Sequence, residues 1–215
     1  MGKRLAKEKE GTHMIENVIF DVGKVLVEFD WENVMRRLGF EEDTIREVAK
    51  ATVQSKTWDK SDGGILTPEE LLTEFISNAP EYEKEIRLFW EHQAETIWKY
   101  DYVEEWFAAL RAAGKKIYIL SNFPEKLYHD AQKELSFAKE ADGAIFSWME
   151  KLTKPDMAIY ELLLSRYGLD AENSVFIDDR QVNLDGAAKV GIHTLLFAGY
   201  EETRDKLEKL VLFRK

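Results

Sequence analysis

The sequence has no cysteine, and its 215 residues include only four prolines and four histidines. Without cysteine the chain can form no disulfide, no thiol nucleophile and no thiolate zinc site. The histidines have no mutual spacing typical of a zinc site or a catalytic triad. No apolar run approaches the ~20 residues that a membrane-spanning helix needs. We therefore expect a cytoplasmic protein without membrane contact, because a reducing compartment suits such a chain.

The chain is short of positive charge. It has 30 Lys and Arg residues against 41 Asp and Glu residues, a formal net charge of −11 at pH 7. This charge repels phosphodiester backbones, so nucleic acid is not an expected partner. Hydrophobic residues make up 45% of the chain and aromatic residues 12%, enough to bury a sizeable core. Size and composition indicate one large domain or a domain that carries an insertion.

The first 13 residues differ in character from the rest of the chain. They are polar and mixed in charge, and they end just where an apolar segment begins at Met14. We interpret residues 1–13 as an expression leader and Met14 as the native start, with a short native helical arm as the alternative.

Short apolar runs alternate with helical patterns over most of the chain. The apolar runs, each short enough for a buried parallel strand, are 15–20, 116–120, 144–146, 174–177 and 193–197. The helical patterns are 102–110, 124–135, 155–167 and 182–190, and we place Pro124 and Pro155 just inside helix starts. This alternation predicts an α/β fold: a doubly wound, Rossmann-like parallel sheet of about five strands. In such sheets the ligand site lies outside the carboxyl ends of the strands.

Residues 31–100 break the alternation. Their apolar residues follow helical spacing almost throughout, and we find no convincing strand among them. Thr67 is expected to cap a helix that begins at Pro68. We predict an all-helical cap domain over 31–100, inserted into an α/β core made of residues 14–30 and 101–215. We expect Trp31 or Trp58 of this cap to face the ligand, because aromatic faces commonly pack on sugars.

Polar motifs stand where the predicted strands end. In chain order they are Asp21-Val22-Gly23-Lys24-Val25, Ser121-Asn122, Lys154-Pro155, and Asp178-Asp179 with Asn183. One acidic residue in such a place is often only a helix cap, but four motifs in one order indicate a site.

This set of motifs resembles the haloacid dehalogenase-like hydrolase superfamily, and the resemblance covers the chain from Met14 to about Leu196. The Asp-x-Gly-x-Val form of the first motif, followed by a helical cap, looks most like the branch that contains sugar-phosphate phosphatases of the glucose-1-phosphate type. The resemblance implies that Asp21 is the nucleophile and that Ser121 and Asn122 bind phosphate.

The same resemblance implies that Lys154 balances charge at the reacting phosphate and that Asp178 and Asp179 help to hold Mg²⁺. Asp21 and the backbone carbonyl of Gly23 would complete the metal ligands. The chemistry agrees with these roles, because a carboxylate that attacks a phosphoryl group needs a cation to overcome charge repulsion. A lysine and a hydroxyl can stabilise the charge on the transferring group.

The leading hypothesis is therefore a Mg²⁺-dependent phosphatase that hydrolyses a small phosphorylated metabolite through an aspartyl-phosphate intermediate, with a sugar phosphate as the favoured substrate. One alternative is a 2-haloacid dehalogenase, in which the same aspartate displaces halide from carbon. It needs no metal, so the acidic pair at 178–179 argues against it. The other alternative is a non-enzymatic module that binds a phosphorylated ligand.

Gly23 keeps the non-enzymatic alternative open. Most phosphatases of the superfamily have Asp at this position, where it protonates the leaving oxygen and then activates water. An acid/base group is typically worth 10² to 10⁴-fold in rate, so we expect slow turnover and a preference for leaving groups that depart unprotonated, such as those of sugar 1-phosphates. A backbone with positive φ would be another reason for glycine here.

Overall fold

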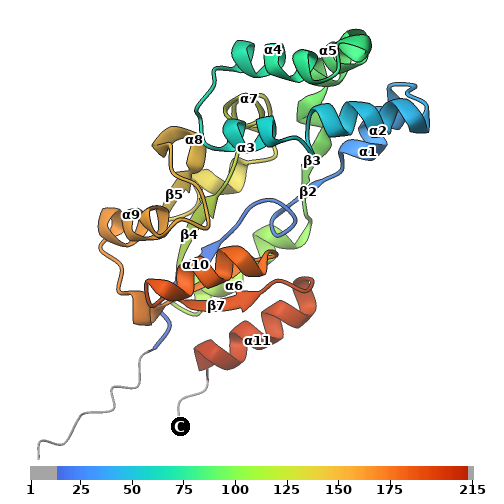
Figure 1. The fold of residues 1–215 in the computed structure, drawn as a ribbon. Helices are drawn as coiled ribbons and strands as arrows, with labels where there is room; N and C mark the ends of the chain where they lie inside the picture. The colour runs from blue at the N-terminus through green and yellow to red at the C-terminus, as the bar shows by residue number, and fades with distance from the viewer. Residues whose placement is uncertain (1–13, 213–215) are drawn as a thin grey trace, which may run out of the picture.

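The computed structural model describes residues 14–212 and has an α/β fold around a five-stranded sheet (Figure 1). The strands are β1 (Asn17–Phe20), β4 (Lys116–Ser121), β5 (Gly143–Phe146), β6 (Ser174–Asp178) and β7 (His193–Leu196). They lie in the order β5-β4-β1-β6-β7, and every neighbouring pair is parallel. The predicted doubly wound parallel sheet is confirmed. The strand order reverses beside β1, which is where such folds bind their ligands.

Helices cover both faces of the sheet. They are α6 (Tyr102–Ala112), α7 (Glu125–Asp130), α8 (Ser147–Glu150), α9 (Met157–Tyr167), α10 (Gln181–Lys189) and α11 (Tyr200–Leu212). Because side chains alternate along a strand, Val18 and Phe20 of β1 join a hydrophobic cluster with Trp106 of α6. Ile19 points to the other face and packs in a cluster with Leu163 of α9 and residues of α10. The central strand is thus buried on both sides, which fixes the position of its carboxyl end.

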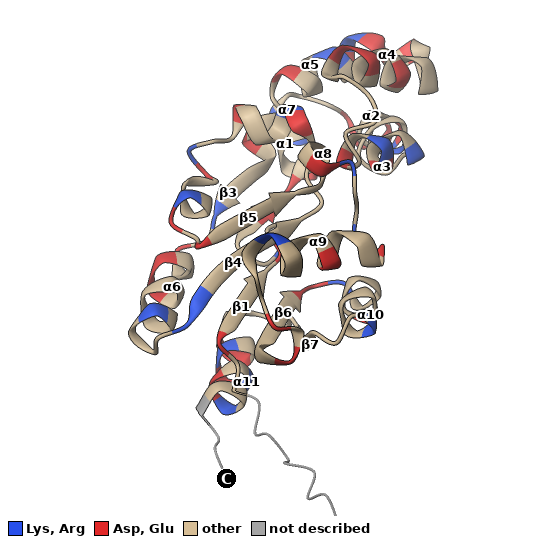
Figure 2. Cartoon of the chain, turned by 90° about the vertical axis from the view of Figure 1, so that its left-hand side faces the viewer, with Lys and Arg blue, Asp and Glu red and all other residues tan. Residues whose placement is uncertain are grey.

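A group of five helices follows the first strand and lies beyond one end of the sheet (Figures 1 and 2). They are α1 (Trp31–Arg37), α2 (Glu42–Ala51), α3 (Lys56–Asp62), α4 (Pro68–Asn78) and α5 (Glu83–Glu91). We call residues 31–96 the helical segment. It has a hydrophobic cluster of its own, formed by side chains such as Met35, Val48, Phe75 and Phe89. The prediction for α4 is confirmed, since Thr67 caps it and forms a capping box with Glu70.

A short ribbon joins the helical segment to the sheet. Strands β2 (Val27–Phe29) and β3 (Ile97–Lys99) pair antiparallel, with Phe29 opposite Ile97. The expectation that residues 31–100 contain no strand is therefore wrong near the end of that range. Three residues are too few to produce a period-two pattern, and the pairing partner lies about 70 residues earlier in the chain.

The two proline placements also need correction. Pro124 is the extended N-cap residue of α7, with ψ 145°, and α7 ends at Asp130 instead of Leu135. Pro155 follows a cis peptide bond and precedes α9 by two residues. Pro124 stays extended after β4, where the Phe123 N–H donates to the Ser147 hydroxyl. Lys154 and Pro155 form a turn instead, in which the Asp156 N–H donates to the Thr153 carbonyl and the Lys154 N–H donates to Asn122 Oδ1. Four 3₁₀ turns complete the fold of residues 14–212: η1 (Pro80–Tyr82), η2 (Gln93–Thr96), η3 (Ser136–Lys139) and η4 (Ala171–Asn173).

Charged residues of both signs are distributed over the outer faces of the helices (Figure 2). Within residues 14–212, no helix is both long enough and apolar enough to cross a membrane. The interpretation of residues 1–13 as a leader lies outside the described residues.

Candidate active site

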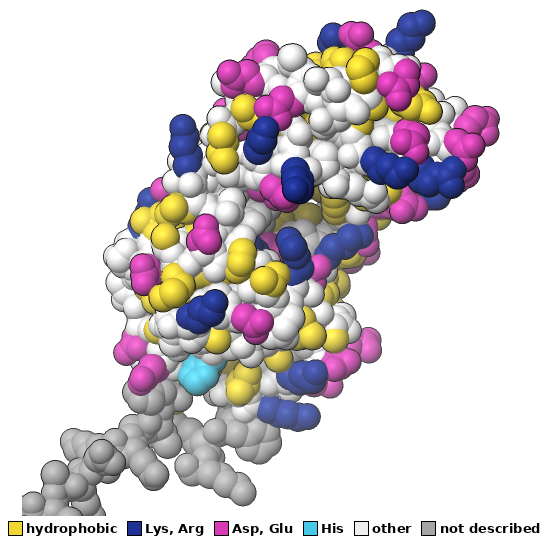
Figure 3. All heavy atoms as spheres, in the orientation of Figure 1, with side chains coloured by type: hydrophobic (Ala, Val, Ile, Leu, Met, Phe, Trp, Pro, Cys, Tyr) yellow, Lys and Arg dark blue, Asp and Glu magenta, His cyan; other side chains and the backbone are white. Residues whose placement is uncertain are grey.

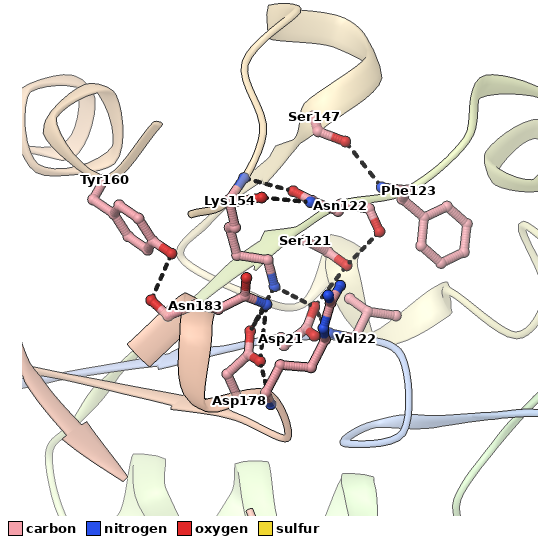
Figure 4. Close-up of polar contacts among 11 residues, drawn as sticks. Asp21, Val22, Ser121, Asn122, Phe123, Ser147, Lys154, Tyr160, Asp178 and Asn183 are labelled. Carbon is pink, nitrogen blue, oxygen red and sulfur yellow. Dashed lines mark hydrogen bonds and ion pairs between the residues drawn. The ribbon is translucent and has the colours of Figure 1, made fainter. Parts of the chain in front are cut away.

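Asp21 is the first residue after β1, and its carboxylate is held by three donors (Figure 4). Its Oδ1 atom accepts hydrogen bonds from the backbone N–H of Val22 at 2.7 Å and from the hydroxyl of Ser121 at 2.8 Å. The ammonium of Lys154 lies 2.8 Å from the same oxygen. These contacts orient the side chain, and no hydrogen bond from the described residues engages Oδ2. One carboxylate oxygen is thus fixed while the other is free to react.

Lys154 is buried between two carboxylates. Its Nζ atom lies 2.8 Å from Asp21 Oδ1 and 2.7 Å from Asp178 Oδ2. The side chain of Asn122 holds the backbone of Lys154 from both sides: Nδ2 donates to the Lys154 carbonyl at 3.0 Å, and Oδ1 accepts from the Lys154 N–H at 2.8 Å. Asn122 therefore positions the lysine, a contact that the sequence did not indicate.

Asp178 ends β6 and is completely buried. The amide of Asn183 donates to both of its carboxylate oxygens at 3.0 Å, and the backbone N–H of Arg180 donates to Oδ1 at 2.8 Å. Asn183 is itself held by Tyr160, whose hydroxyl donates to the Asn183 carbonyl at 2.7 Å. The end of β6 is thus tied to α9 and α10, and the Asp178 carboxylate has a fixed position.

The acidic residues form a cluster that could hold a metal ion. Within the described part of the chain, Asp21, Asp178 and Asp179 each offer a carboxylate oxygen, and these oxygens lie within 4.8 Å of one another. Asp178 is already paired with Lys154, whereas Asp179 is partly exposed. Oxygen-only ligands on loops suit Mg²⁺, so the donor set fits the predicted ion.

Electrostatics also favour a cation here. Burial raises the pKa of Asp21 to about 6, although the ammonium of Lys154 opposes this rise. Burial and the nearby Asp178 carboxylate raise the pKa of Asp179. Burial lowers the pKa of Lys154, but the carboxylates of Asp21 and Asp178 outweigh it, so the net shift is upward and the lysine stays charged. Three carboxylates face one ammonium, and a divalent cation would relieve that imbalance.

A cavity of about 180 Å³ opens beside Asp21, between the sheet and the helical segment. The surface is visibly hollowed between the upper and lower parts of the molecule, with hydrophobic and basic side chains in its walls (Figure 3). The polar lining includes Asp21, Asn122, Lys154, Asp179, Arg180 and Asn183. The apolar lining consists of Val27, Phe29, Trp58, Ile97, Phe123, Pro124 and Leu127. The cavity therefore has one charged end and one apolar wall.

The strand-end residues singled out in the sequence come together at this cavity, but the two tryptophans differ. Trp58 lines the cavity and lies 5.8 Å, centroid to centroid, from the ring of Phe29. Trp31 packs against the hydrophobic cluster of the helical segment and is not among the lining residues. Of the two, only Trp58 is placed to meet a ligand.

Gly23 lines the cavity as well, but the suggestion that it needs a positive φ is wrong. The left-handed residue of this turn is its neighbour Lys24, with φ 61°. A Cβ atom at Gly23 would meet no heavy atom within 4 Å. The backbone would therefore accept a side chain at this position, and its absence leaves open space next to Asp21.

Four residues at this site, Asp62, Arg180, Ser147 and Phe123, were not indicated by any sequence pattern. Asp62 and Arg180 line the cavity, and Ser147 accepts a hydrogen bond from the Phe123 N–H at 2.9 Å. Asp62 lies in the helical segment, where nothing in the strand pattern points to it. Only the glycine pair that comes after it, at 63–64, marks the place as a turn.

Comparison with known proteins agrees with this geometry. A family model described as haloacid dehalogenase-like hydrolase matches residues 15–191. The chain belongs to this family, and it is a hydrolase with the fold of that family.

Individual relatives are more distant. The chain is 24% identical to the sesquiterpene phosphatase astK of Aspergillus oryzae over 194 residues, which cover 90% of this chain and 95% of that protein. It is 29% identical to the (S)-2-haloacid dehalogenase 4A of Burkholderia cepacia over 86 residues, 40% of this chain and 37% of that one. A solved structure of the HAD family enzyme bt-2542 from Bacteroides thetaiotaomicron, in complex with magnesium and inorganic phosphate, is similar with a TM-score of 0.70 and 22% identity, covering 88% of this chain and 98% of that one.

Proposed function

We propose that the protein is a Mg²⁺-dependent phosphatase that hydrolyses a small phosphomonoester through an aspartyl-phosphate intermediate. The observation that carries this proposal is the Asp21 carboxylate, which is fixed by Ser121 and Lys154 at the mouth of a cavity and lies beside two further aspartates. Mg²⁺ complexes and a phosphatase among the relatives support the same class of substrate.

Each of the described site residues has its own role in the proposed reaction. Asp21 Oδ2 is the nucleophile, and Lys154 together with the Ser121 hydroxyl offers donors to the phosphoryl oxygens. Asp21, Asp179 and the Gly23 carbonyl would hold the ion, with Asp178 behind them. When bound, Mg²⁺ would screen the repulsion between the carboxylate and the phosphate. Asn122 keeps Lys154 in place through its two backbone hydrogen bonds.

We also propose that the helical segment acts as a cap that selects the substrate. Its residue Trp58 forms part of the apolar wall, so the organic part of the substrate would bind against that ring. A sugar can stack one face on an aromatic ring, and a terpenyl chain can pack on the same wall. A screen of sugar, nucleotide, acid and terpenyl phosphates, with and without Mg²⁺, tests the function and ranks these classes.

Replacing Trp58 by alanine is expected to raise KM and to change the ranking of substrates in this screen, because it removes part of the wall that contacts the leaving group. Trp31→Ala is the matched control, since Trp31 belongs to the same segment but does not line the cavity. It should leave the ranking unchanged. Identical kinetics in the Trp58 variant and the wild type would mean that the substrate binds elsewhere.

Removing divalent cations with a chelator is expected to abolish turnover, and added Mg²⁺ should restore it. Asp21 and Asp179 would otherwise repel each other and the phosphate. Asp179→Asn should weaken the binding of Mg²⁺ and therefore raise the Mg²⁺ concentration needed for the half-maximal rate. Full activity in chelator would reject the metal site.

A further inference from the structure

Asp62, the last residue of α3, brings a carboxyl group into the cavity from the side of the helical segment. Its Oδ1 atom is buried and has no hydrogen-bond partner among residues 14–212. A buried carboxylate oxygen without a partner costs stability, so its presence in a cavity calls for an explanation. The same cavity contains Asp21 and Lys154.

The backbone around Asp62 is tied to the core. The Ser147 hydroxyl accepts from the Phe123 N–H and donates to the Asp62 carbonyl oxygen, so it links the helical segment to the strand end that carries Ser121. Two residues further on, a Cβ atom at Gly64 would lie 2.3 Å from the carbonyl oxygen of Trp148, which shows how closely the two backbones approach. Asp62 therefore has a fixed place relative to Asp21.

The surroundings of Asp62 bring the pKa of its carboxyl close to neutral pH. Burial, followed by the charge of Asp59 on the same helix, raises the pKa of Asp62 to about 7. Asp21 adds to the rise, while Lys154 and Arg180 oppose it. A group that titrates near the working pH can both give and take a proton, as a general acid and base must.

The proposed reaction needs such a group. Gly23 carries no side chain, and the ammonium of Lys24 forms an ion pair with Glu28. Asp21 and Asp179 are assigned to attack and to the ion. Among the described lining residues, Asp62 is the remaining carboxyl. We propose that Asp62 is the general acid and base of the hydrolysis, a role that rests on the proposed phosphatase function.

In the first step Asp21 Oδ2 attacks phosphorus, the bond from phosphorus to the leaving oxygen breaks, and that oxygen keeps the bonding pair and takes the proton of Asp62. The alcohol leaves, with the phosphoryl group on Asp21 and Asp62 ionised. In the second step Asp62 takes a proton from water as the water oxygen attacks phosphorus. The bond from phosphorus to Asp21 breaks, so that phosphate leaves, Asp21 is again a carboxylate and Asp62 is again protonated.

Asp62→Asn tests both steps when two substrates are compared, an alkyl phosphate and p-nitrophenyl phosphate. Turnover of the alkyl phosphate should fall by roughly 10² to 10⁴-fold, because its leaving oxygen needs a proton. Nitrophenolate leaves without a proton, so the variant should release one equivalent of nitrophenolate per active site in a burst. Turnover should then be slow, because no base activates the water that hydrolyses the phosphorylated Asp21. Asp43→Asn is the control, because it makes the same chemical change at a carboxylate of the helical segment that is 88% exposed and does not line the cavity, and it should stay within about twofold of the wild type on both substrates.

Unchanged rates in the Asp62 variant on both substrates would overturn this role while leaving the phosphatase function intact. An equal loss on the two substrates without a burst would also overturn it, because that pattern belongs to a structural defect. A wild-type protein that hydrolyses no phosphomonoester would overturn the proposed function and this role with it.

Thermal unfolding provides a readout that does not depend on activity. Because the pKa of Asp62 is raised in the folded protein from 3.8 to about 7, the wild type loses stability as pH rises through this window. Asp62→Asn has no such charge to bury, so its Tm should exceed that of the wild type at pH 8 and approach it at pH 4. Equal Tm differences at the two pH values would overturn the assignment of a buried, unpartnered carboxyl.

Discussion

Replacing Asp21 by asparagine is expected to reduce phosphatase turnover by roughly 10⁴- to 10⁶-fold, as removal of an essential nucleophile does. Asparagine is nearly isosteric and can still accept the hydrogen bonds from Val22 and Ser121 through its side-chain oxygen. It lacks the negative charge needed to attack phosphorus. The measurement is kcat on the best phosphomonoester, together with circular dichroism and Tm.

The matched control is Asp156→Asn. Asp156 precedes α9, is exposed and makes no side-chain capping bond, so the same chemical change there should leave kcat unaffected. A folded Asp21 variant with wild-type turnover would refute the covalent route. The same loss in the Asp156 control would show that the assay does not report on the nucleophile.

Replacing Lys154 by methionine is expected to remove activity and also to lower the free energy of unfolding by about 3–5 kcal/mol at pH 8. Removing one partner of a buried ion pair leaves the other charge uncompensated, and here two buried carboxylates, Asp21 and Asp178, lose their common cation. Lys133→Met is the control, because that side chain is 95% exposed and its removal should change stability by no more than about 0.5 kcal/mol.

The Lys154 variant should recover part of its stability in acid. The ammonium lowers the pKa of Asp21 against the effect of burial, so its loss moves that pKa above the present value of about 6. A carboxyl with a raised folded-state pKa stabilises the fold at low pH and destabilises it as pH rises. Denaturant unfolding at pH 5 and pH 8 measures the difference. A loss of unfolding free energy that is the same at both pH values, or that is below about 1 kcal/mol at pH 8, would contradict the buried charge network.

The sheet was predictable because its three inner strands, β4, β1 and β6, are buried on both faces, and each strand reads as a short apolar run between helical patterns. The run that contains Val18 and Ile19 ends at Phe20, just before Asp21, in both the sequence and the structure. The parallel arrangement then brings Ser121 and Asp178 to the same edge, although 57 residues separate them. The sequence-based grouping of strand-end motifs follows directly from this property of parallel sheets.

The contributions from the helical segment were not predictable in the same way. The exposure of Trp58 to the cavity and the packing of Trp31 away from it depend on how α1 and α3 pack, which no local sequence pattern indicates. Asp62 owes its place to the contact of its carbonyl with Ser147, which lies 85 residues further along the chain. Ribbon β2–β3 was missed for a related reason, since its stability comes from a distant partner and not from a local pattern.

The covalent intermediate on Asp21 is the central claim, and mass spectrometry of the enzyme tests it most directly. The wild type is mixed with an excess of its best phosphomonoester and Mg²⁺, quenched in acid during steady-state turnover and digested under acidic conditions that preserve acyl phosphates. We predict a phosphoryl group on the peptide that contains Asp21 and on no peptide of the Asp21→Asn variant. Turnover without any phosphorylated peptide, or with the phosphoryl group on another residue, would contradict the account.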